Sequence, residues 1–331
     1  MSKILLLGLG RWGANHLRVL NSLQPQIELF ATDLNPKALD AARKLGLRDD
    51  HLSTNYKDFA GKVDGAVIVT PAQSHFPLAK EFLEDGKDVF VEKPLTLVPD
   101  ESKQLAELAA KTGRLVQVGH IFRFDPATQW LREQVQAGTF GNIRILRGHF
   151  GGFKRPRNDS GVMFADGIHF VDLFNYILGA VPTRVRAEWY DFLGRGPGFD
   201  DASRTSLEYD TRFGKTWATV ETEYFIPGKF RDVIVIGDKL TAVCNYDLPS
   251  NKIKTYANHH VAEGKDFKGV EGAPVQIETA AVEPLLAELK AFCESITTRK
   301  APLADAWAGY DSVRVLTAAA EANKTAGWVT I

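Results

Sequence analysis

Residues 3–20 read KILLLGLGRWGANHLRVL, an apolar run followed by three closely spaced glycines and then by an amphipathic segment. The run is typical of a buried parallel strand and the segment after it of a helix. The glycines Gly8, Gly10 and Gly13 follow the spacing G-x-G-x-x-G. In such a strand–turn–helix unit they permit the tight turn, the approach of a pyrophosphate and the packing of helix on strand. The helix N-terminus then faces the anion, so the stretch predicts a dinucleotide site.

An acidic residue stands where this kind of site needs one. A second strand, residues 27–32 (IELFAT), ends at Asp33, 20 residues after Gly13. A carboxylate there would hydrogen-bond the ribose hydroxyls and repel a 2′-phosphate, so we expect NAD rather than NADP. A glycine turn followed by an unrelated surface aspartate would not explain why strand, glycines, helix and acid all keep this register.

Strand and helix patterns continue to alternate up to about residue 120, with strands at 65–70, 88–91 and 114–119 and helices at 36–46, 74–86 and 99–113. This alternation predicts a doubly wound parallel sheet, which binds ligands beyond the carboxyl ends of its strands. Polar clusters follow three of the strands: TPAQSH (70–75), EKP (92–94) and GHIFRF (119–124). By itself EKP would be a solvated turn, but its place at this edge favours a function for Lys93.

The pattern changes after residue 121. A helix at 126–138, a strand at 142–151, a basic loop at 152–159 and a helix at 160–179 precede a series of strands from about 183 to 280. Gly237-Asp238 is typical of a hairpin turn between two of these strands. We read 258–274 as a polar loop and 284–300 and 305–325 as amphipathic helices. We therefore expect an α/β protein with two domains, residues 1–121 and 122–331.

Composition argues for small-molecule partners or further copies of the chain. Hydrophobic residues make up 44%, charged residues 24% and the net charge is -1, so no basic excess would attract nucleic acid or a membrane surface. The cysteines, Cys244 and Cys293, are too few for a disulfide framework or a zinc site, which fits a reducing compartment. No signal peptide and no apolar run near 18 residues occurs. We expect a cytoplasmic protein.

Four stretches together resemble the glucose-fructose oxidoreductase / inositol dehydrogenase / rhizopine catabolism (Gfo/Idh/MocA) family: GLGRWGANHL (8–17), VIVTPAQSHFPLAKEFLEDGKDVFVEKPLTL (67–97), VGHIFRF (118–124) and GIHFVD (167–172). The resemblance implies a Rossmann domain, then an α+β domain with a large, mostly antiparallel open sheet, and hydride transfer to or from a sugar or polyol. It implies that Lys93 is catalytic and that the Lys93–Pro94 peptide is cis. In this family a second subunit commonly covers the open sheet, so we expect a homodimer or homotetramer; cover by the chain's own helices is the alternative.

The chemistry of alcohol oxidation supports a role for Lys93. The hydroxyl proton must leave as hydride moves to the nicotinamide. A free lysine, with a pKa of about 10.4, is a poor base, but desolvation and the positive nicotinamide of NAD both favour its neutral form. Glu92 lies on the opposite side of the strand, so we assign it a supporting role.

Asp166, His169 and Asp172 recur at three-residue spacing within the helix predicted at 160–179. They could form a metal site, though the chain offers no convincing further ligand, or a buried histidine held by two aspartates. We favour His169 as an acid/base or substrate-orienting residue, which is what the resemblance implies. The family's aspartate four residues before this histidine is replaced by Ala165. Either Asp166 substitutes for it, or Lys93 and His169 suffice.

The predicted site residues fall into two sets. The predicted NAD-binding residues are Gly8, Gly10, Arg11, Trp12, Gly13, Asp33, Thr70, Pro71, His75, Glu92 and Lys93. The predicted substrate-binding residues are His120, Arg123, Arg155, Arg157, Asp166 and His169, with Lys93, His169 and Asp166 catalytic and no metal ligand.

One stretch and one loop bear on the substrate. VGHIFRFDPA (118–127) resembles the family members that act on nucleotide-linked sugars, the nucleotide-sugar 3-dehydrogenases. Lys154, Arg155 and Arg157 of the basic loop could hold a diphosphate, or the loop could be solvated surface. We expect an NAD-dependent oxidoreductase acting on a sugar, with a free sugar or inositol as the alternative substrate. A non-catalytic NAD-binding regulator is the alternative of another class.

Overall fold

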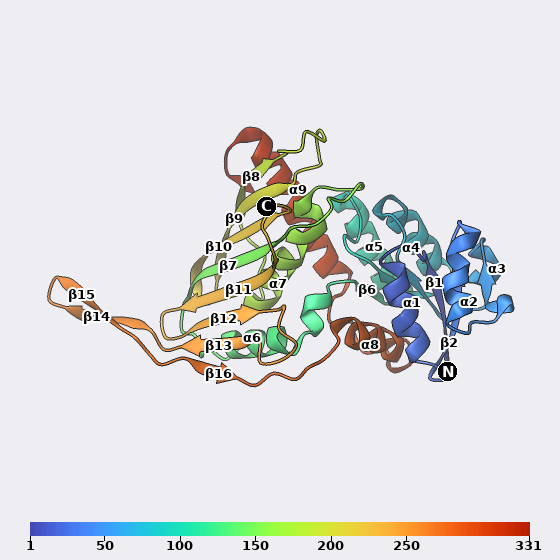
Figure 1. Cartoon of the computed structure of the whole chain (residues 1–331), viewed down its shortest axis with the longest axis horizontal. Coiled ribbons are helices and arrows are strands. Elements are labelled where there is room, and N and C mark those ends of the chain that lie inside the picture. The colour runs from blue at the N-terminus through green and yellow to red at the C-terminus, as the bar shows by residue number, and fades with distance from the viewer. The chain divides into compact units, whose positions relative to one another are not determined.

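The computed structural model describes residues 1–331 and divides into two compact units (Figure 1). Unit 1 comprises Met1–Phe124 and Glu283–Val313, and unit 2 comprises Asp125–Val282 and Arg314–Ile331. The change after Phe124 lies close to the boundary expected from the sequence. The C-terminal segment differs, because helix α8 (Pro284–Thr298) belongs to unit 1 rather than to the second domain. Its apolar side, including Phe292, is buried in the same core cluster as strand β1.

Unit 1 is the predicted doubly wound sheet. Its strands are β1 (Ser2–Leu7), β2 (Ile27–Thr32), β3 (Leu52–Ser53), β4 (Gly65–Ile68), β5 (Asp88–Val91) and β6 (Val116–Val118). They are all parallel, in the order β3-β2-β1-β4-β5-β6. The helices are α1 (Gly13–Ser22), α2 (Leu39–Lys44), α3 (Lys57–Ala60), α4 (His75–Glu84), α5 (Pro99–Thr112) and α8. Two apolar core clusters, with alternate side chains of β1 in different clusters, show that both faces of the sheet are covered.

Unit 2 is built on a nine-stranded sheet in the order β16-β13-β12-β11-β7-β10-β9-β8-β17. The strands are β7 (Ile143–Gly152), β8 (Arg184–Tyr190), β9 (Ala202–Thr211), β10 (Gly214–Glu223), β11 (Lys229–Gly237), β12 (Thr241–Asn245), β13 (Ile253–Tyr256), β16 (Val275–Ile277) and β17 (Val329–Thr330). Only β7 and β10 pair in parallel. The hairpin predicted at Gly237-Asp238 is confirmed, since β11 and β12 pair antiparallel around it. The fold class expected from the sequence is therefore confirmed in both units.

Helices cover one face of the large sheet, as Figure 1 shows for α6 (Pro126–Gln136) and α7 (Ile168–Leu178). Helix α7 packs so closely on β7 that a Cβ at Gly148 would lie 2.6 Å from the Phe170 ring. Helix α9 (Ala306–Thr325) belongs to unit 1 up to Val313 and to unit 2 from Arg314 on.

The segment predicted as a polar loop at 258–274 contains a hairpin instead. Strands β14 (His259–Glu263) and β15 (Asp266–Val270) form a separate two-stranded sheet, which extends past the end of the nine-stranded sheet in Figure 1. Every strand residue but Val270 is exposed, so the segment has none of the apolar alternation by which a sequence indicates a half-buried strand. None of the helices is both long and apolar enough to cross a bilayer.

Candidate active site

The glycine-rich turn has the geometry that a dinucleotide needs. Gly8 has a φ of +92°, and a Cβ at Gly13 would lie 2.0 Å from the Gly8 carbonyl oxygen, so neither position accepts a side chain. A Cβ at Gly10 would meet nothing within 4 Å, which leaves the backbone there open to a ligand. Arg11 and Trp12 of the turn are exposed. The turn thus combines tight packing behind Gly10 with an open surface in front of it.

Asp33 lies at the end of β2 and holds this turn. Its Oδ2 accepts the Leu9 N–H at 2.7 Å and its Oδ1 accepts the Asn35 N–H at 2.8 Å. A carboxylate can accept about four hydrogen bonds, so Asp33 keeps capacity for ribose hydroxyls. The contact to Leu9 was not expected from the sequence.

Glu92 connects the glycine-rich turn to the lysine at the end of β5. Its carboxylate accepts the Trp12 indole N–H at 2.6 Å and the Lys93 backbone N–H at 3.0 Å, and Nε2 of His16 lies 3.1 Å away. Burial raises the pKa of Glu92, but the His16 hydrogen bond and charge, Lys93 and Trp12 outweigh it, and the pKa is lowered overall. Glu92 is therefore an anion that positions its neighbours. The indole N–H of Trp12 is used in this hydrogen bond. His16 also belongs to this cluster, and the sequence did not indicate its role.

His75 joins two of the polar clusters at the strand ends. Its side chain is buried, with Nδ1 2.8 Å from the Pro94 carbonyl oxygen and Nε2 2.9 Å from the Thr70 carbonyl oxygen. Burial lowers the pKa of His75, against the opposing effect of these two carbonyls. Both ring nitrogens contact backbone, so His75 supports the Lys93–Pro94 turn, whose peptide is cis as the resemblance implied. Pro71, in the same cluster, is exposed.

The third cluster in unit 1, after β6, is buried. His120 and Arg123 have little exposed surface, and the Arg123 guanidinium donates to the Leu303 carbonyl oxygen at 2.8 Å. Arg123 thus ties the end of the sheet to the segment that follows α8.

In unit 2 the regular helix predicted over 160–179 begins instead with a π turn, Met163–Gly167, before α7. A π turn accommodates one residue more than an α turn. The three-residue spacing of Asp166, His169 and Asp172 therefore does not place Asp166 on the same helix face as the other two. Asp166 lies in the π turn and its Oδ2 is 2.6 Å from the ammonium nitrogen of Lys154. Ala165, at the position of the family's aspartate, is buried.

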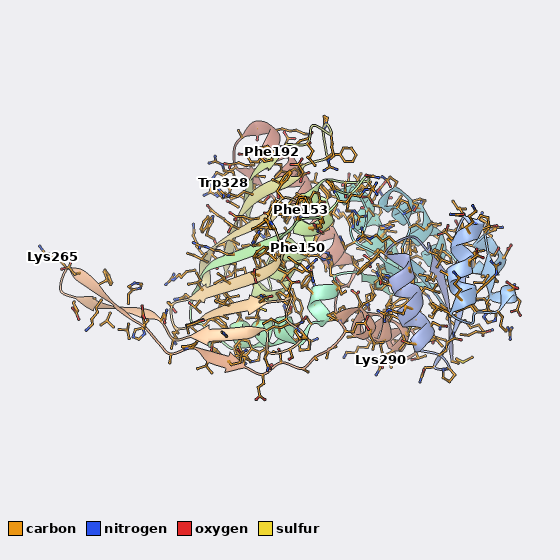
Figure 2. The ribbon with its side chains drawn as sticks, viewed as in Figure 1. Phe150, Phe153, Phe192, Lys265, Lys290 and Trp328 are labelled. Atoms are coloured by element: carbon orange, nitrogen blue, oxygen red, sulfur yellow. The ribbon has the colours of Figure 1, made fainter.

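His169 stands in the first turn of α7. Its ring stacks on Phe150 of β7, with the centroids 5.7 Å apart and the planes at 12° (Figure 2 labels Phe150). The Lys154 ammonium lies over the same phenyl ring, 5.1 Å from its centroid. Asp172 is buried farther along α7. No group of three or more His, Cys, Asp or Glu side chains is arranged to hold a metal ion.

The basic loop makes more ion pairs and hydrogen bonds within the protein than its composition suggests. Arg157 donates twice to Asp159, at 2.8 and 2.6 Å, and this contact raises the pKa of the guanidinium. Arg195 donates to the Arg157 carbonyl oxygen at 2.7 Å and so holds the loop from the side. With Lys154 paired to Asp166, only the exposed Arg155 of the three cations has no carboxylate partner.

Two further residues beside this loop were missed by sequence reasoning. Asp200 is buried and accepts the Met163 N–H at 2.9 Å; burial raises its pKa to about 6, against the opposing effect of that hydrogen bond. Tyr224 follows β10, is 2% exposed, and its hydroxyl has no hydrogen-bond partner in the protein. Neither belongs to a motif, so no pattern in the sequence could indicate them.

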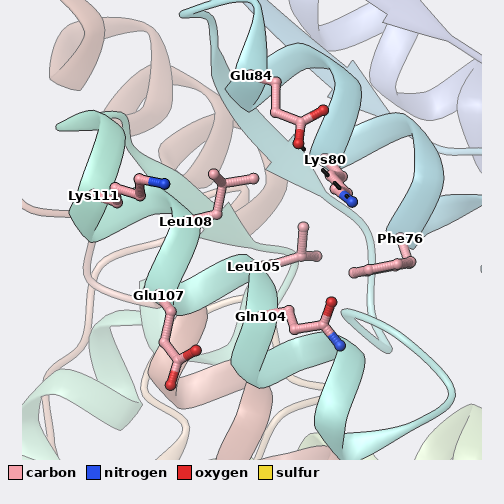
Figure 3. Close-up of a pocket in the computed structure, with 8 residues that line it drawn as sticks. All are labelled: Phe76, Lys80, Glu84, Gln104, Leu105, Glu107, Leu108 and Lys111. Carbon is pink, nitrogen blue, oxygen red and sulfur yellow. Dashed lines mark ion pairs between the residues drawn. The ribbon is translucent and has the colours of Figure 1, made fainter.

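A shallow groove lies between α4 and α5, but it carries no catalytic chemistry. Figure 3 shows its lining: Phe76, Lys80, Glu84, Gln104, Leu105, Glu107, Leu108 and Lys111. Its one ion pair, Lys80–Glu84 at 3.9 Å, is a surface contact within α4. None of these residues lies at a strand end, and we assign the site to the strand ends instead.

Comparison with known proteins identifies the family. The model of an oxidoreductase family with an NAD-binding Rossmann fold matches residues 2–120, and the model of the family's C-terminal alpha/beta domain matches residues 132–331. The chain belongs to the Gfo/Idh/MocA family. The expected family, the oxidoreductase class and NAD as cofactor are thereby confirmed.

The named relatives include dehydrogenases of sugars and cyclitols. The chain is 34% identical over 188 residues to scyllo-inositol 2-dehydrogenase (NAD(+)) of Bacillus subtilis, covering 54% of this chain and 55% of that protein. It is 31% identical over 183 residues to UDP-N-acetylglucosamine 3-dehydrogenase of Acidithiobacillus ferrooxidans, covering 55% and 56%. Both matches span only about half the length of the relative. The structure of levoglucosan dehydrogenase with NADH and levoglucosan has the same fold, with a TM-score of 0.82, 19% identity and coverage of 100% and 99%.

Proposed function

We propose that the protein oxidises a secondary alcohol of a polyhydroxylated ring, a sugar or cyclitol, with NAD as the hydride acceptor. Lys93 accepts the hydroxyl proton, and His169 exchanges protons with the substrate or orients it. Asp33 and the glycine-rich turn hold the nucleotide. The observation that carries the proposal is the contact of one carboxylate, Glu92, with both Trp12 of the cofactor turn and the Lys93 backbone.

This contact matters because proton and hydride transfer must occur at neighbouring atoms. Hydride goes to the nicotinamide, so the base has to be fixed relative to the cofactor. Glu92 fixes the Lys93 turn to the glycine-rich turn through hydrogen bonds of 2.6 and 3.0 Å, and His75 braces the same turn from the other side. Such bracing is what a preorganised catalytic lysine requires.

Substitution of the proposed base tests this function. Lys93→Ala should lower turnover by roughly 10²- to 10⁴-fold and leave NADH affinity nearly unchanged, because only proton transfer is lost. His169→Ala should lower turnover by the same factor or less. Lys87→Ala, which changes a partly exposed lysine just before β5, serves as the matched control. Normal rates in both Lys93→Ala and His169→Ala would refute the assignment. NADH binding without turnover of any ring alcohol would instead indicate a regulator.

A nucleotide-linked sugar is the finer candidate for the substrate. The similarity to UDP-N-acetylglucosamine 3-dehydrogenase and the basic loop support it. The ion pairs of Lys154 and Arg157 weigh against it, because they leave Arg155 as the available cation for a diphosphate.

A substrate panel separates these possibilities. We would follow NADH formation with UDP-N-acetylglucosamine, free aldoses, levoglucosan and myo-inositol. If the substrate is nucleotide-linked, Arg155→Ala should raise KM more than it lowers kcat, since it removes uniform binding. A strong response to free ring alcohols, without gain from the nucleotide, would discard the nucleotide-linked substrate and leave the dehydrogenase standing.

A further inference from the structure

Beside His169, a charged pair lies on two aromatic rings. The Lys154 ammonium is 2.6 Å from Asp166 and lies 5.1 and 5.3 Å from the ring centroids of Phe150 and Tyr224. The pair joins two separate elements, the loop after β7 and the π turn before α7, unlike the local Arg157–Asp159 pair. The Lys154 side chain is 37% exposed and that of Asp166 13%, so a ligand can reach the ammonium.

The Tyr224 hydroxyl belongs to the same group. It is buried, and it has no hydrogen-bond partner in the protein. Burial raises the pKa of the phenol most, the charge of Asp166 raises it further and that of Arg157 lowers it. A buried hydroxyl without a partner costs stability, so its retention points to a polar ligand as its partner.

The donors and acceptors of this group match a pair of neighbouring hydroxyls. An ammonium has three N–H donors and a carboxylate about four acceptor sites, so each keeps capacity after the Lys154–Asp166 contact, while a phenol both donates and accepts. Each hydroxyl of a vicinal diol also donates and accepts. Because Lys154 and Asp166 are paired and their charges cancel, the group offers no net attraction to an anion or a cation, which favours an uncharged ligand.

We infer that Lys154, Asp166 and Tyr224 form a subsite that binds two neighbouring hydroxyls of an uncharged polyhydroxylated ring. The inference rests on the proposed function and adds its specificity determinants. It also gives a role to Asp166, which lies one residue after the position of the family's aspartate, where this chain has Ala165. The π turn carries the Asp166 carboxylate, and Lys154 of the basic loop pairs with it.

Three variants test the subsite: Tyr224→Phe, Lys154→Met and Asp166→Asn, with the exposed hairpin residue changed in Lys265→Met as the control. Binding of myo-inositol, D-glucose and levoglucosan to the NADH-loaded protein is measured by calorimetry, and KM and kcat are measured separately with NAD. Tyr224→Phe should weaken binding and raise KM about tenfold with little change in kcat, as for loss of one hydrogen bond. Lys154→Met and Asp166→Asn should weaken binding about 10- to 100-fold, because charged hydrogen bonds are stronger.

A deoxy analogue makes the test specific. The monodeoxy form of the best-bound probe that lacks the hydroxyl facing Tyr224 should bind wild type and Tyr224→Phe equally well, since the contact is already gone. Tyr224→Phe should also keep or raise the unfolding midpoint, because no protein partner is lost.

The outcomes separate this inference from the proposed function. Turnover by the wild type with unchanged KM in all three variants would overturn the subsite and leave the function standing, the ion pair then being structural only. Binding that depends on the three residues without turnover would support the subsite and refute the function. Failure of the wild type to bind any of the probes would overturn the assignment of an uncharged ring diol.

Discussion

Asp33 shows how one side chain can serve both the fold and the choice of cofactor. It accepts the Leu9 N–H, which fixes the glycine-rich turn, and we expect its charge to lie where a 2′-phosphate would bind. The sequence predicted the second role from the distance to Gly13. It could not predict the first, because a contact between Asp33 and Leu9 depends on the pairing of β1 with β2.

These two roles can be separated experimentally. Asp33→Asn keeps an acceptor for Leu9 but removes the charge, whereas Asp33→Ser removes the charge and, because its side chain is shorter, withdraws the acceptor oxygen from Leu9. The unmodified protein should bind NAD(H) more tightly than NADP(H). Both variants should narrow that gap by about fivefold, from loss of like-charge repulsion of roughly 1 kcal/mol. Only Asp33→Ser should also weaken NADH binding, as measured by NADH fluorescence titration. Equal affinity for both cofactors in the unmodified protein would contradict the role of Asp33.

Asp200 supplies a pH dependence whose sign follows from its environment. Burial raises the pKa of Asp200 from its ordinary value of 3.8 to about 6. The folded state therefore binds this proton more tightly than the unfolded chain does. The resulting stability is fully present below about pH 4 and is lost as pH rises to about 6.

The neutral amide tests this sign. Asp200→Asn should be more stable than the wild type above pH 6, by up to about 3 kcal/mol, and the difference should vanish toward pH 4. The Asn oxygen can still accept the Met163 N–H, so the backbone contact is kept. Guanidinium unfolding at several pH values measures the difference. A gap between the two proteins that grows on acidification would show that the sign is wrong.

At the element scale, α6 begins at a buried ion pair. Asp125 caps the helix by accepting the Ala127 N–H at 2.9 Å, and it also pairs with Lys252 beside β13. Their side chains are only 4% and 6% exposed. Removing one partner would leave the other charge buried, which costs far more than the pair itself contributes.

Variants of this pair should follow that rule. Asp125→Asn keeps an oxygen that accepts the Ala127 N–H but leaves the Lys252 charge buried without a partner. It should lower the free energy of unfolding by about 3–5 kcal/mol. Asp125→Ala should cost about 1 kcal/mol more through loss of the cap. Asp125→Asn combined with Lys252→Met should recover most of the loss, because no buried charge remains. A double variant no more stable than Asp125→Asn in urea unfolding would argue against the ion pair as the cause.

The elements that sequence patterns predicted are those with a one-sided apolar stripe or alternation, such as α5 and the β11–β12 hairpin. Two of the elements that they missed have a physical reason in common. Hairpin β14–β15 is exposed on nearly all its residues, and the π turn at Met163–Gly167 adds a residue within an apolar segment whose periodicity stays the same. Neither changes the pattern of hydrophobic residues, so neither could be predicted from it.

At the scale of the whole molecule, amphipathic patterns show that a helix buries a face but not which surface receives it. The predicted helix at 284–300 forms as expected, yet Phe292 and Leu289 join the core cluster of unit 1. The predicted partition of the chain at residues 121 and 122 therefore describes only the first crossing between the units. That the segment Glu283–Val313 belongs to unit 1 depends on tertiary packing, which a single sequence does not reveal.

The open face of the nine-stranded sheet leads to the last prediction. Trp217, Ile145 and Ile236 lie in register on the adjacent strands β10, β7 and β11, and all three are partly exposed. A row of large apolar side chains at the middle of an uncovered sheet is typical of a subunit interface. We therefore expect a homodimer or homotetramer that buries this row, with an isologous contact in the dimer.

Charge placed in the row should separate the subunits. Trp217→Glu combined with Ile145→Glu should convert the oligomer to a monomer in light scattering at micromolar concentration, since unpaired charges at the centre of an interface cost several kcal/mol. Lys265→Glu in hairpin β14–β15, outside the nine-stranded sheet, is the control and should leave the mass unchanged. NADH affinity of the monomer should be retained, because the glycine-rich turn and Asp33 belong to unit 1. A wild-type protein that is monomeric throughout, or a double variant of unchanged mass, would exclude this face as the interface.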